Sequence, residues 1–330
     1  MQIAGLLVLL IAFVQVPTFK ADPPHKCESC DEWNKPREPF KLFGNTYYVG
    51  TEGLSALLIV GDQGLILLDG ALEQSAALID RNIHKLGFKT EDIKLIVNSH
   101  GHYDHAGGIN ALQRASGATV VASPSSASAL QRGENTPDDP QFGFGREANA
   151  FPAVKNVRVI KDGEVQRVGT LAITPHFTPG HTPGSTTWTW QSCQPSRPEA
   201  ASARSRRSSP ATVRAEADEG AKCLNMVYAD SISAVSAPGF RFTDHPALVT
   251  QMRRSITRVG ELPCDVMVST HPQFTRIDEK LTRRAAMKPG DVDPFIDPQL
   301  CQAYSATFMK SLETRLADEQ KQGKKQEQHQ

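Results

Sequence analysis

The sequence predicts an α/β sandwich, in which two mixed β-sheets stack face to face and helices cover their outer faces. Three observations lead to this prediction. The chain has 330 residues, 39% of them hydrophobic, which is enough to bury one large core. Segments with strand-like and helix-like patterns succeed one another along it. Each half of the chain carries strands and then helices, so each half can supply one sheet and its covering layer.

The first half begins with strand-like sequence over residues 45–69. Two β-rich runs within it are joined by the turn sequence GDQG, and this pattern predicts a hairpin. Apolar residues at helical spacing then predict a helix over 72–86, which Gly87 is placed to end. The other elements expected here are strands over 93–99 and 118–123 and a helix over 106–117.

The second half opens with a polar connection over residues 133–156. This connection contains Pro and Gly and is long enough to be a functional or a mobile loop. Beyond it, the sequence predicts short strands and two helices. The strands are expected over 157–161, 164–168, 171–177, the later part of 180–190, 224–231 and 264–270, and the helices over 245–260 and 298–319.

Residues 1–21 are predicted to be a signal peptide. The run MQIAGLLVLLIAFVQV is apolar and uncharged, has the length of a signal-peptide core, and precedes Ala21, a small residue suited to a cleavage point. The run is too short for a comfortable membrane span, and no second long apolar stretch follows. An N-terminal anchor that is never cleaved is the alternative. We expect an exported, periplasmic protein without membrane contact after cleavage.

The mature chain is expected to be one domain over residues 22–317, which starts with an extended arm containing Pro and Cys. Residues 194–222 are rich in Ser, Ala, Arg and Pro and have no apolar periodicity. We interpret them as a disordered loop insertion. A basic binding patch is the alternative, which the interleaved acidic residues disfavour. Residues 318–330 form a polar tail, of which the last ten residues, KQGKKQEQHQ, are expected to be disordered.

The charge balance argues against two classes of partner. Lys and Arg together number 36, as do Asp and Glu, so the formal net charge is zero. This balance gives no electrostatic reason to expect binding to nucleic acid or to an anionic membrane. No protein partner is evident from the sequence either.

A dense group of titratable side chains occurs in the stretch SHGHYDHAGG, residues 99–108. Its ligand-type side chains follow a predicted buried strand, so they lie on a loop at the carboxyl end of that strand. Imidazole and carboxylate groups at close spacing suit borderline metals such as zinc. His100 and His102 can reach one ion while Asp104 and His105 reach a neighbouring one. The glycines of the stretch allow the backbone to turn tightly.

Two further histidines are candidates to complete the metal sites, since a tetrahedral zinc needs three or four protein donors. His181 lies between glycines at a strand junction, and His271 comes just after a predicted buried strand. Both therefore lie at strand ends, as the histidine-rich stretch does. His176 falls inside a strand and is expected to pack or to support a ligand. The histidines outside these positions are His25, His84, His245 and His329.

The segment HGHYDH matches H-x-H-x-D-H, so the chain resembles the metallo-β-lactamase superfamily. The pattern is strong for fold and metal but weak for substrate. The stretches HFTPGHTPGSTTWTW, VYADSIS and LPCDVMVSTHP resemble class B β-lactamases of the third subclass in particular. The resemblance covers residues 27–316 apart from 194–222. It implies the four-layer αββα sandwich of that family.

The resemblance also implies two zinc ions per chain and a set of ligands for each. Asp104 would additionally orient the attacking hydroxide and act as the catalytic residue. The first ion would be held by His100, His102 and His181, and the second by Asp104, His105 and His271.

Further residues are implicated in substrate binding by the same resemblance. Ser231 and Ser233 match two serines that help to bind the substrate carboxylate in that subclass. Phe240 stands where some relatives have a tyrosine, whose hydroxyl helps to hold the carbonyl oxygen. If the position is equivalent, this chain lacks that donor, and zinc must polarise the carbonyl more.

The activity that the resemblance implies is hydrolysis of the β-lactam ring of penicillins, cephalosporins and carbapenems by a zinc-bridging hydroxide. The partner would be a small-molecule β-lactam, and the result antibiotic resistance. A lactonase or a glyoxalase II-like thioesterase on the same fold is the alternative. Such enzymes bridge their metals with an extra aspartate, for which Asp230 is the candidate. A zinc-dependent binding or storage protein is a third hypothesis.

Six cysteines are an even number, and export makes their pairing expected. A bond between Cys264 and Cys301 would tie the C-terminal helix to the sheet. Cys193 and Cys223 are placed to close the base of the insertion. The two cysteines of the C-x-x-C pair are expected to form a small local loop, in preference to a zinc or redox site, and they are Cys27 and Cys30.

Overall fold

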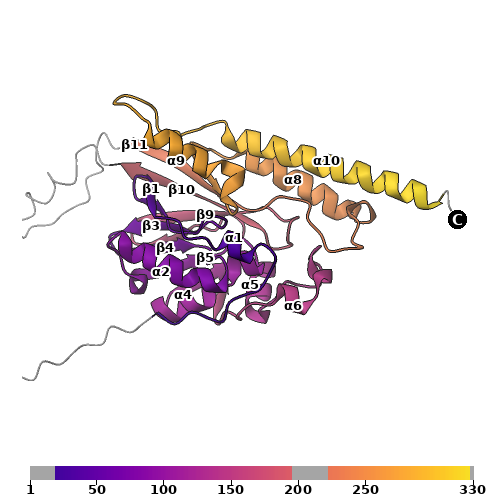
Figure 1. The fold of residues 1–330 in the computed structure, drawn as a ribbon, viewed down its shortest axis with the longest axis horizontal. Helices are drawn as coiled ribbons and strands as arrows, with labels where there is room; N and C mark the ends of the chain where they lie inside the picture. The colour runs from indigo at the N-terminus through magenta and orange to yellow at the C-terminus, as the bar shows by residue number, and fades with distance from the viewer. Residues whose placement is uncertain (1–18, 195–221, 328–330) are drawn as a thin grey trace, which may run out of the picture.

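Two β-sheets form the centre of the fold, and helices cover their outer faces (Figure 1). The computed structural model describes residues 19–194 and 222–327. Most of the predicted signal peptide (1–18), most of the predicted insertion (195–221) and the last three residues of the tail therefore lie outside the described residues. The layers are those of the predicted αββα sandwich.

The first sheet contains seven strands in the order in which they occur along the chain. They are β1 (Phe40–Phe43), β2 (Thr46–Tyr48), β3 (Leu57–Gly61), β4 (Gly64–Leu68), β5 (Ile93–Val97), β6 (Thr119–Ala122) and β7 (Val157–Val159). Strands β1 to β4 pair antiparallel, which confirms the predicted hairpin, and β4 to β7 pair parallel.

Three helices cover the first sheet and make the crossovers that its parallel strands require. They are α2 (Ala76–Lys85), α4 (Ile109–Ser116) and α5 (Pro124–Arg132), and they lie together on one side of the molecule (Figure 1). Helix α2 presents buried apolar residues to the sheet at helical spacing, including Ile79 and Ile83. The chain leaves it through Gly87 in a left-handed conformation, as predicted.

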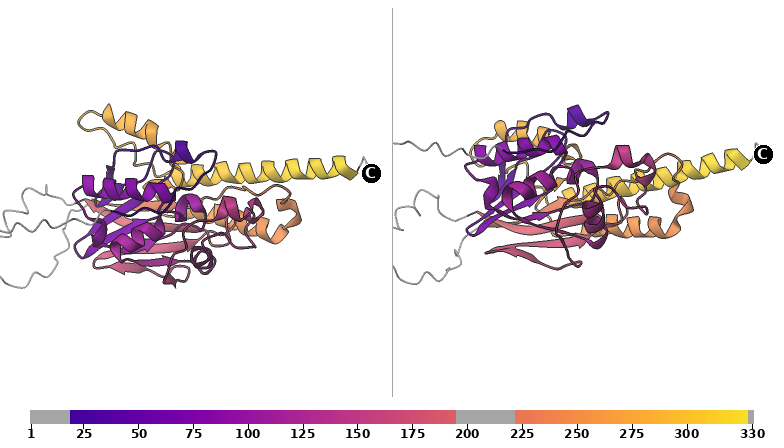
Figure 2. Two further views of the ribbon diagram at one scale, coloured as in Figure 1. Left: turned by 60° about the horizontal axis from the view of Figure 1, so that its bottom comes forward. Right: turned by 90° about the horizontal axis from the view of Figure 1, so that it is seen from below.

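The second sheet has five strands in the order β12-β11-β10-β9-β8. They are β8 (Gln166–Val168), β9 (Leu171–Phe177), β10 (Thr186–Gln194), β11 (Lys222–Ala229) and β12 (Val266–Ser269). Only β11 and β12 are parallel, and α8 (Pro246–Glu261) connects them. This helix packs against the long α10 (Leu300–Glu327), whose end extends beyond the sheets in both views of Figure 2.

A core of large side chains fills the space between the two sheets. Trp188 and Tyr228 from the second sheet pack there with Tyr48 and Leu68 from the first, and all four are almost fully buried. Burial of each such side chain stabilises the fold by roughly 1.5–3 kcal/mol. The indole Nε1 of Trp188 also donates to the carbonyl of Asn98 at 3.0 Å. The core therefore fixes the second sheet to the chain just before the histidine-rich stretch.

Backbone contacts hold the histidine-rich stretch against the end of β4. The amide of Gly70 donates to the carbonyl of His105 at 2.9 Å, and the amide of Gly108 donates to that of Ala71 at 3.1 Å. A Cβ on Gly108 would overlap the carbonyl oxygen of Gly70. Only glycine therefore allows the two segments to approach so closely.

Several helices differ from the sequence expectations. Helix α5 is capped by the side chain of Ser123 and begins at Pro124, but its small residues give a weak apolar pattern. Helix α9 (Ile277–Ala285) is mostly charged and was also missed. The predicted extended arm contains the short helix α1 (Cys30–Trp33), and the polar connection contains α6 (Arg146–Asn149).

The prediction that residues 321–330 are disordered was wrong for their described part, because α10 continues to Glu327. The segment contains no proline and is rich in Glu, Gln and Lys, which favour helix. The side chain of Glu319 also accepts a hydrogen bond from the amide of Thr243 at 2.9 Å and pairs with Arg315. This contact fixes the helix against the domain.

All three predicted disulfides form. Cys264–Cys301 ties the start of α10 to the chain entering β12, and Cys193–Cys223 joins facing residues of β10 and β11. The third bond closes the C-x-x-C pair in the arm. A disulfide typically stabilises a fold by ~2–4 kcal/mol. No helix in the described ranges has both the length and the apolarity of a membrane span.

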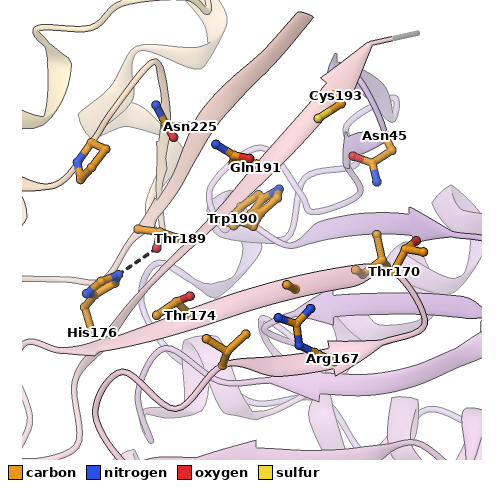
Figure 3. Close-up of a pocket in the computed structure, with 14 residues that line it drawn as sticks. Asn45, Arg167, Thr170, Thr174, His176, Thr189, Trp190, Gln191, Cys193 and Asn225 are labelled. Carbon is orange, nitrogen blue, oxygen red and sulfur yellow. Dashed lines mark hydrogen bonds between the residues drawn. The ribbon is translucent and has the colours of Figure 1, made fainter. Parts of the chain in front are cut away.

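The outer face of β8 to β11 carries a hollow of about 690 Å³ (Figure 3). Its walls mix apolar side chains with uncharged polar ones, among them Thr174, Thr189 and Gln191. His176 lies at its edge and contacts Thr189 Oγ1 through Nε2 at 2.8 Å. This contact agrees with the expectation that His176 is a packing residue, and the hollow contains none of the predicted metal ligands.

Candidate metal centre

The six predicted metal ligands come together at one edge of the sandwich. The histidine-rich stretch leaves the end of β5, His181 lies in the loop between β9 and β10, and His271 follows β12. The imidazole ring of His100 lies at the middle of the group. Its ring centroid is 4.4 to 4.9 Å from those of His102, His105 and His181.

The first three histidines form a compact set. One potential ligand atom from each of His100, His102 and His181 lies within 4.8 Å of the others, and all three side chains are buried. A tetrahedral metal ion binds four ligand atoms. Here two loops bring three such protein atoms together at a spacing that can surround one ion.

Each of these three rings has one nitrogen held by an oxygen. Nδ1 of His100 lies 2.6 Å from Asp230 Oδ1, and Nδ1 of His181 lies 3.0 Å from the carbonyl oxygen of Ser233. The Nε2 of His102 lies 3.0 Å from Asp139 Oδ2. An oxygen on one ring nitrogen fixes the ring and leaves the other nitrogen to bind a cation, which is the usual arrangement around metal-bound histidines.

The other three predicted ligands meet at a single carboxylate oxygen. Asp104 Oδ2 lies 3.2 Å from Nε2 of His105 and 3.3 Å from Nε2 of His271. Ligand atoms of His100, Asp104 and His105 also lie within 4.8 Å of one another. The two sets of three are therefore neighbours, and His100 lies close to both.

Unpaired buried atoms test whether these residues fit a metal. Nε2 of His100 and Nδ1 of His271 are buried and have no hydrogen-bond partner, and the same holds for both ring nitrogens of His105. Leaving such a group unpaired costs about 1–3 kcal/mol each. A cation among them would accept the lone pairs of neutral imidazoles, so the residues fit a metal centre.

The protonation states of two histidines and the aspartate also suit metal binding. Burial and neighbouring imidazoles hold the pKa of His100 well below its ordinary value and lower that of His181 to about 3. Burial opposes ionisation of Asp104, but the contacts with His105 and His271 keep its pKa well below the usual range. These groups are therefore neutral imidazoles and an ionised carboxylate at neutral pH, the forms that bind cations.

Two other ligands behave differently. Burial lowers the pKa of His102 and of His105, but the carboxylates of Asp139 and Asp104, respectively, outweigh it, so both pKa values are raised. Protons and a cation compete for these rings. Metal affinity is therefore expected to fall as the pH is lowered.

A pocket of about 290 Å³ opens above the six residues. Ser231 and Ser233, the predicted substrate-binding residues, both line it, and Ser231 Oγ lies 3.0 Å from Thr270 Oγ1. Aromatic side chains also line it, among them Trp33 and Phe274. The pocket thus offers both hydroxyl groups and apolar surface.

Phe240 lies away from this pocket. Its ring stacks on His245 with centroids 4.5 Å apart, and it is absent from the pocket lining among the described residues.

Asp69 supports the start of the histidine-rich stretch and was not anticipated from the sequence. Its buried carboxylate accepts hydrogen bonds from the Ser99 amide at 2.7 Å, from the Ser99 hydroxyl at 2.6 Å and from the Tyr228 hydroxyl at 2.9 Å. Burial raises its pKa to about 6. Asp69 also has a left-handed backbone, with φ of 61°, which is typical of residues at functional sites. The sequence gives no indication of this conformation.

The sequence also did not reveal three more residues near the ligands, because they lie on segments without a periodic pattern. Asp139 and Gln141 lie on the polar connection, which has no readable pattern, and Trp33 lies on the N-terminal arm. The arm brings Trp33 to within 5.4 Å of His271, measured between ring centroids. The length of the 133–156 connection, which predicted a functional or a mobile loop, was the one available indication.

Comparison with protein families gives one match. The family model described as "Metallo-beta-lactamase superfamily" matches residues 49–191. This range includes the histidine-rich stretch and His181, and it ends within β10.

Solved structures extend the similarity to most of the chain. The Rm3 metallo-β-lactamase is 46% identical, with a TM-score of 0.77, and the match covers 89% of this chain and 99% of that one. The metallo-β-lactamase SMB-1, solved with 2-mercaptoethanesulfonate, is 41% identical with a TM-score of 0.75, covering 87% and 99%. MEM-A1, a subclass B3 metallo-β-lactamase from a soil metagenome library, is 41% identical with a TM-score of 0.75. The match covers 88% of this chain and 99% of that one.

Proposed function

Because this chain belongs to the metallo-β-lactamase superfamily and is a hydrolase of that family, we propose that it is a zinc-dependent β-lactamase. Its substrates would be penicillins, cephalosporins and carbapenems. The observation that carries this proposal is the convergence of two sets of three ligands at a pocket that two serines also line.

Two zinc ions are the proposed cofactor, one on His100, His102 and His181 and the other on Asp104, His105 and His271. When bound, zinc supplies hydroxide at neutral pH and polarises a carbonyl oxygen. Nitrogen ligands with a single carboxylate suit zinc better than they suit magnesium or calcium, which prefer oxygen.

The residues around the centre have distinct proposed roles. Asp104 is the only carboxylate of the six ligands, and with one oxygen on the metal its other oxygen would orient the nucleophile. The hydroxyls of Ser231 and Ser233 would bind the carboxylate of a β-lactam. The aromatic wall formed by Trp33 and Phe274 would exclude water and contact the acyl substituent.

The contacts of Asp230 bear on the alternative, a lactonase or a glyoxalase II-like thioesterase. Such an enzyme would use this aspartate to bridge its metals. Here Asp230 Oδ1 lies 2.6 Å from Nδ1 of His100, so this oxygen holds the ring of a proposed ligand. Asp230 does not line the pocket, but Ser231 does. This arrangement supports a β-lactamase over the alternative.

Export to the periplasm is part of the proposal. It is supported by three disulfides, which form in oxidising compartments, and by the apolar N-terminal run. Hydrolysis of β-lactams by an exported enzyme would confer antibiotic resistance.

A spectrophotometric assay tests the function. We expect turnover of one penicillin, one cephalosporin and one carbapenem, its loss after dialysis against a chelator, and its return with Zn²⁺. A hydroxyacyl-glutathione thioester and an acyl-homoserine lactone serve as comparison substrates. Faster turnover of either, with no β-lactam hydrolysis, would favour the alternative. Zinc-bound protein with no turnover of any of the five would favour a binding or storage protein.

A further inference from the structure

We propose that Asp139 is a positioning residue that fixes the tautomer of His102 and couples this ligand to the loop lining the pocket. The inference rests on the proposed metal centre. Asp139 is 4% exposed and lies on the connection between α5 and α6. Its two carboxylate oxygens serve different partners, as the contacts below show.

One oxygen of Asp139 holds the metal ligand. Oδ2 lies 3.0 Å from Nε2 of His102. An ionised carboxylate can only accept a hydrogen bond, so Nε2 must carry the proton. The lone pair of the neutral ring is then on Nδ1, which is the one atom His102 can offer to a metal. The carboxylate thus selects the ligand atom of this histidine.

The other oxygen holds the pocket loop. Oδ1 accepts a hydrogen bond from the backbone amide of Gln141 at 2.7 Å, which makes a local Asx turn. The side chain of Asn149 donates to the carbonyl of Gln141 at 3.2 Å, and both residues line the pocket. The side-chain nitrogen of Gln141 in turn lies 3.4 Å from Nε2 of His181. One carboxylate therefore connects a ligand of the first site to the wall of the pocket.

Two substitutions separate the effect on the histidine from the effect on the loop. Asn also forms Asx turns, so Asp139→Asn can keep its oxygen on the Gln141 amide. Its amide nitrogen then faces Nε2 of His102, which must become an acceptor. The proton moves to Nδ1, and the lone pair for the metal is lost. Asp139→Ala removes the turn but leaves His102 free to adopt either tautomer.

Metal binding and loop exchange are measured together. Metal-free wild-type protein, both variants and the control Asp138→Asn, an exposed neighbour on the same loop, are titrated with Co²⁺ and followed by visible absorption. Hydrogen–deuterium exchange over residues 139–149 reports the loop. We expect Asp139→Asn to lose about 10–100-fold in Co²⁺ affinity with unchanged exchange. Asp139→Ala should exchange faster in the loop and lose less affinity, and the control should match wild type.

Wild-type affinity in Asp139→Asn would overturn the proposal, as would accelerated loop exchange in this variant equal to that of Asp139→Ala. Absence of Co²⁺ binding by the wild type would instead contradict the metal centre itself. If a variant fails to fold, the tautomer is measured in zinc-loaded wild-type protein by nitrogen-15 NMR of labelled histidine. A proton on Nε2 of His102 supports the assignment, and a proton on Nδ1 overturns it.

Discussion

Oδ1 of Asp230 lies 2.6 Å from Nδ1 of His100, and both side chains are completely buried. The carboxylate comes from the end of β11 and the imidazole from the end of β5, so the contact joins the two sheets directly at the proposed metal centre. It also leaves Nε2 of His100 buried and without a hydrogen-bond partner. This pair positions a ligand through the packing of the sandwich.

Replacing Asp230 by Ala should free the imidazole ring of His100 and weaken metal binding. Loss of such an outer partner typically costs about 10–100-fold in affinity. Competition with a chromophoric chelator measures the zinc dissociation constants, and Asp138→Ala, at an exposed position, is the matched control. Unchanged zinc affinity in Asp230→Ala would show that His100 is held by other contacts.

Substituting His271 by Ala should empty the second site selectively. His271 Nε2 lies 3.3 Å from Asp104 Oδ2, and its ring centroid is 4.9 Å from that of His105, so both neighbours belong to the second set. We expect zinc content to fall from two ions per chain to one and kcat/KM to fall at least about a hundredfold, since several kcal/mol of charge stabilisation are lost. Metal analysis checks the content. His84→Ala, on the exposed face of α2, should keep both ions. Loss of both ions from the His271 variant would contradict the assignment to separate sites.

Truncating Phe274 to Ala should weaken binding of substrates that carry an aromatic acyl group. The side chain is 47% exposed, and its ring lies 6.2 Å from that of His271 at the pocket wall. Loss of ~1–2 kcal/mol of apolar contact should raise KM about 5–30-fold and leave zinc content unchanged. Phe144→Ala is the control, because Phe144 is 45% exposed and does not line the pocket. If both variants have the same KM, Phe274 does not contact the substrate.

Lys280 should make stability depend on pH. Its Nζ is buried without a hydrogen-bond partner, 5.7 Å from the centre of the Phe295 ring. Burial lowers its pKa from 10.5 to about 8, an effect that Asp297 opposes and Arg276 and Arg283 reinforce. The unfolded chain therefore holds this proton more tightly, so the contribution of Lys280 to stability rises between pH 8 and pH 10.5.

Lys280→Met should remove that dependence. Below pH 8 the variant is expected to gain up to about 3 kcal/mol in unfolding free energy relative to wild type, and the gain should shrink as the pH approaches 10.5. Urea unfolding at pH 7, 9 and 10.5 measures the difference. Lys310→Met on the exposed face of α10 controls for the loss of a surface charge. A gain that stays constant with pH would come from packing alone.

The sequence by itself determined the parts of this protein whose signals are local. The hairpin of β3 and β4 follows from β-rich runs joined by a turn, and α2 follows from its 3.6-residue period. The spacing of His100, His102, Asp104 and His105 on one loop indicates a metal site without any knowledge of the fold. Cysteine positions beside predicted strands and helices were enough to propose all three disulfides, which the structure contains.

Only the tertiary structure decided which distant groups meet those local motifs. Asp139 contacts a histidine 37 residues away, and Asp230 contacts one 130 residues away. Neither pairing has a periodic signal, because each depends on how loops lie once the sheets have stacked. The same applies to Trp33, which an arm carries to the pocket, and to α10, whose tail is held by Thr243 and Arg315 contacts to Glu319. Short sequence spacing places the metal-ligand side chains on one loop. The packing of the two sheets then decides which distant side chains contact these ligands and orient them.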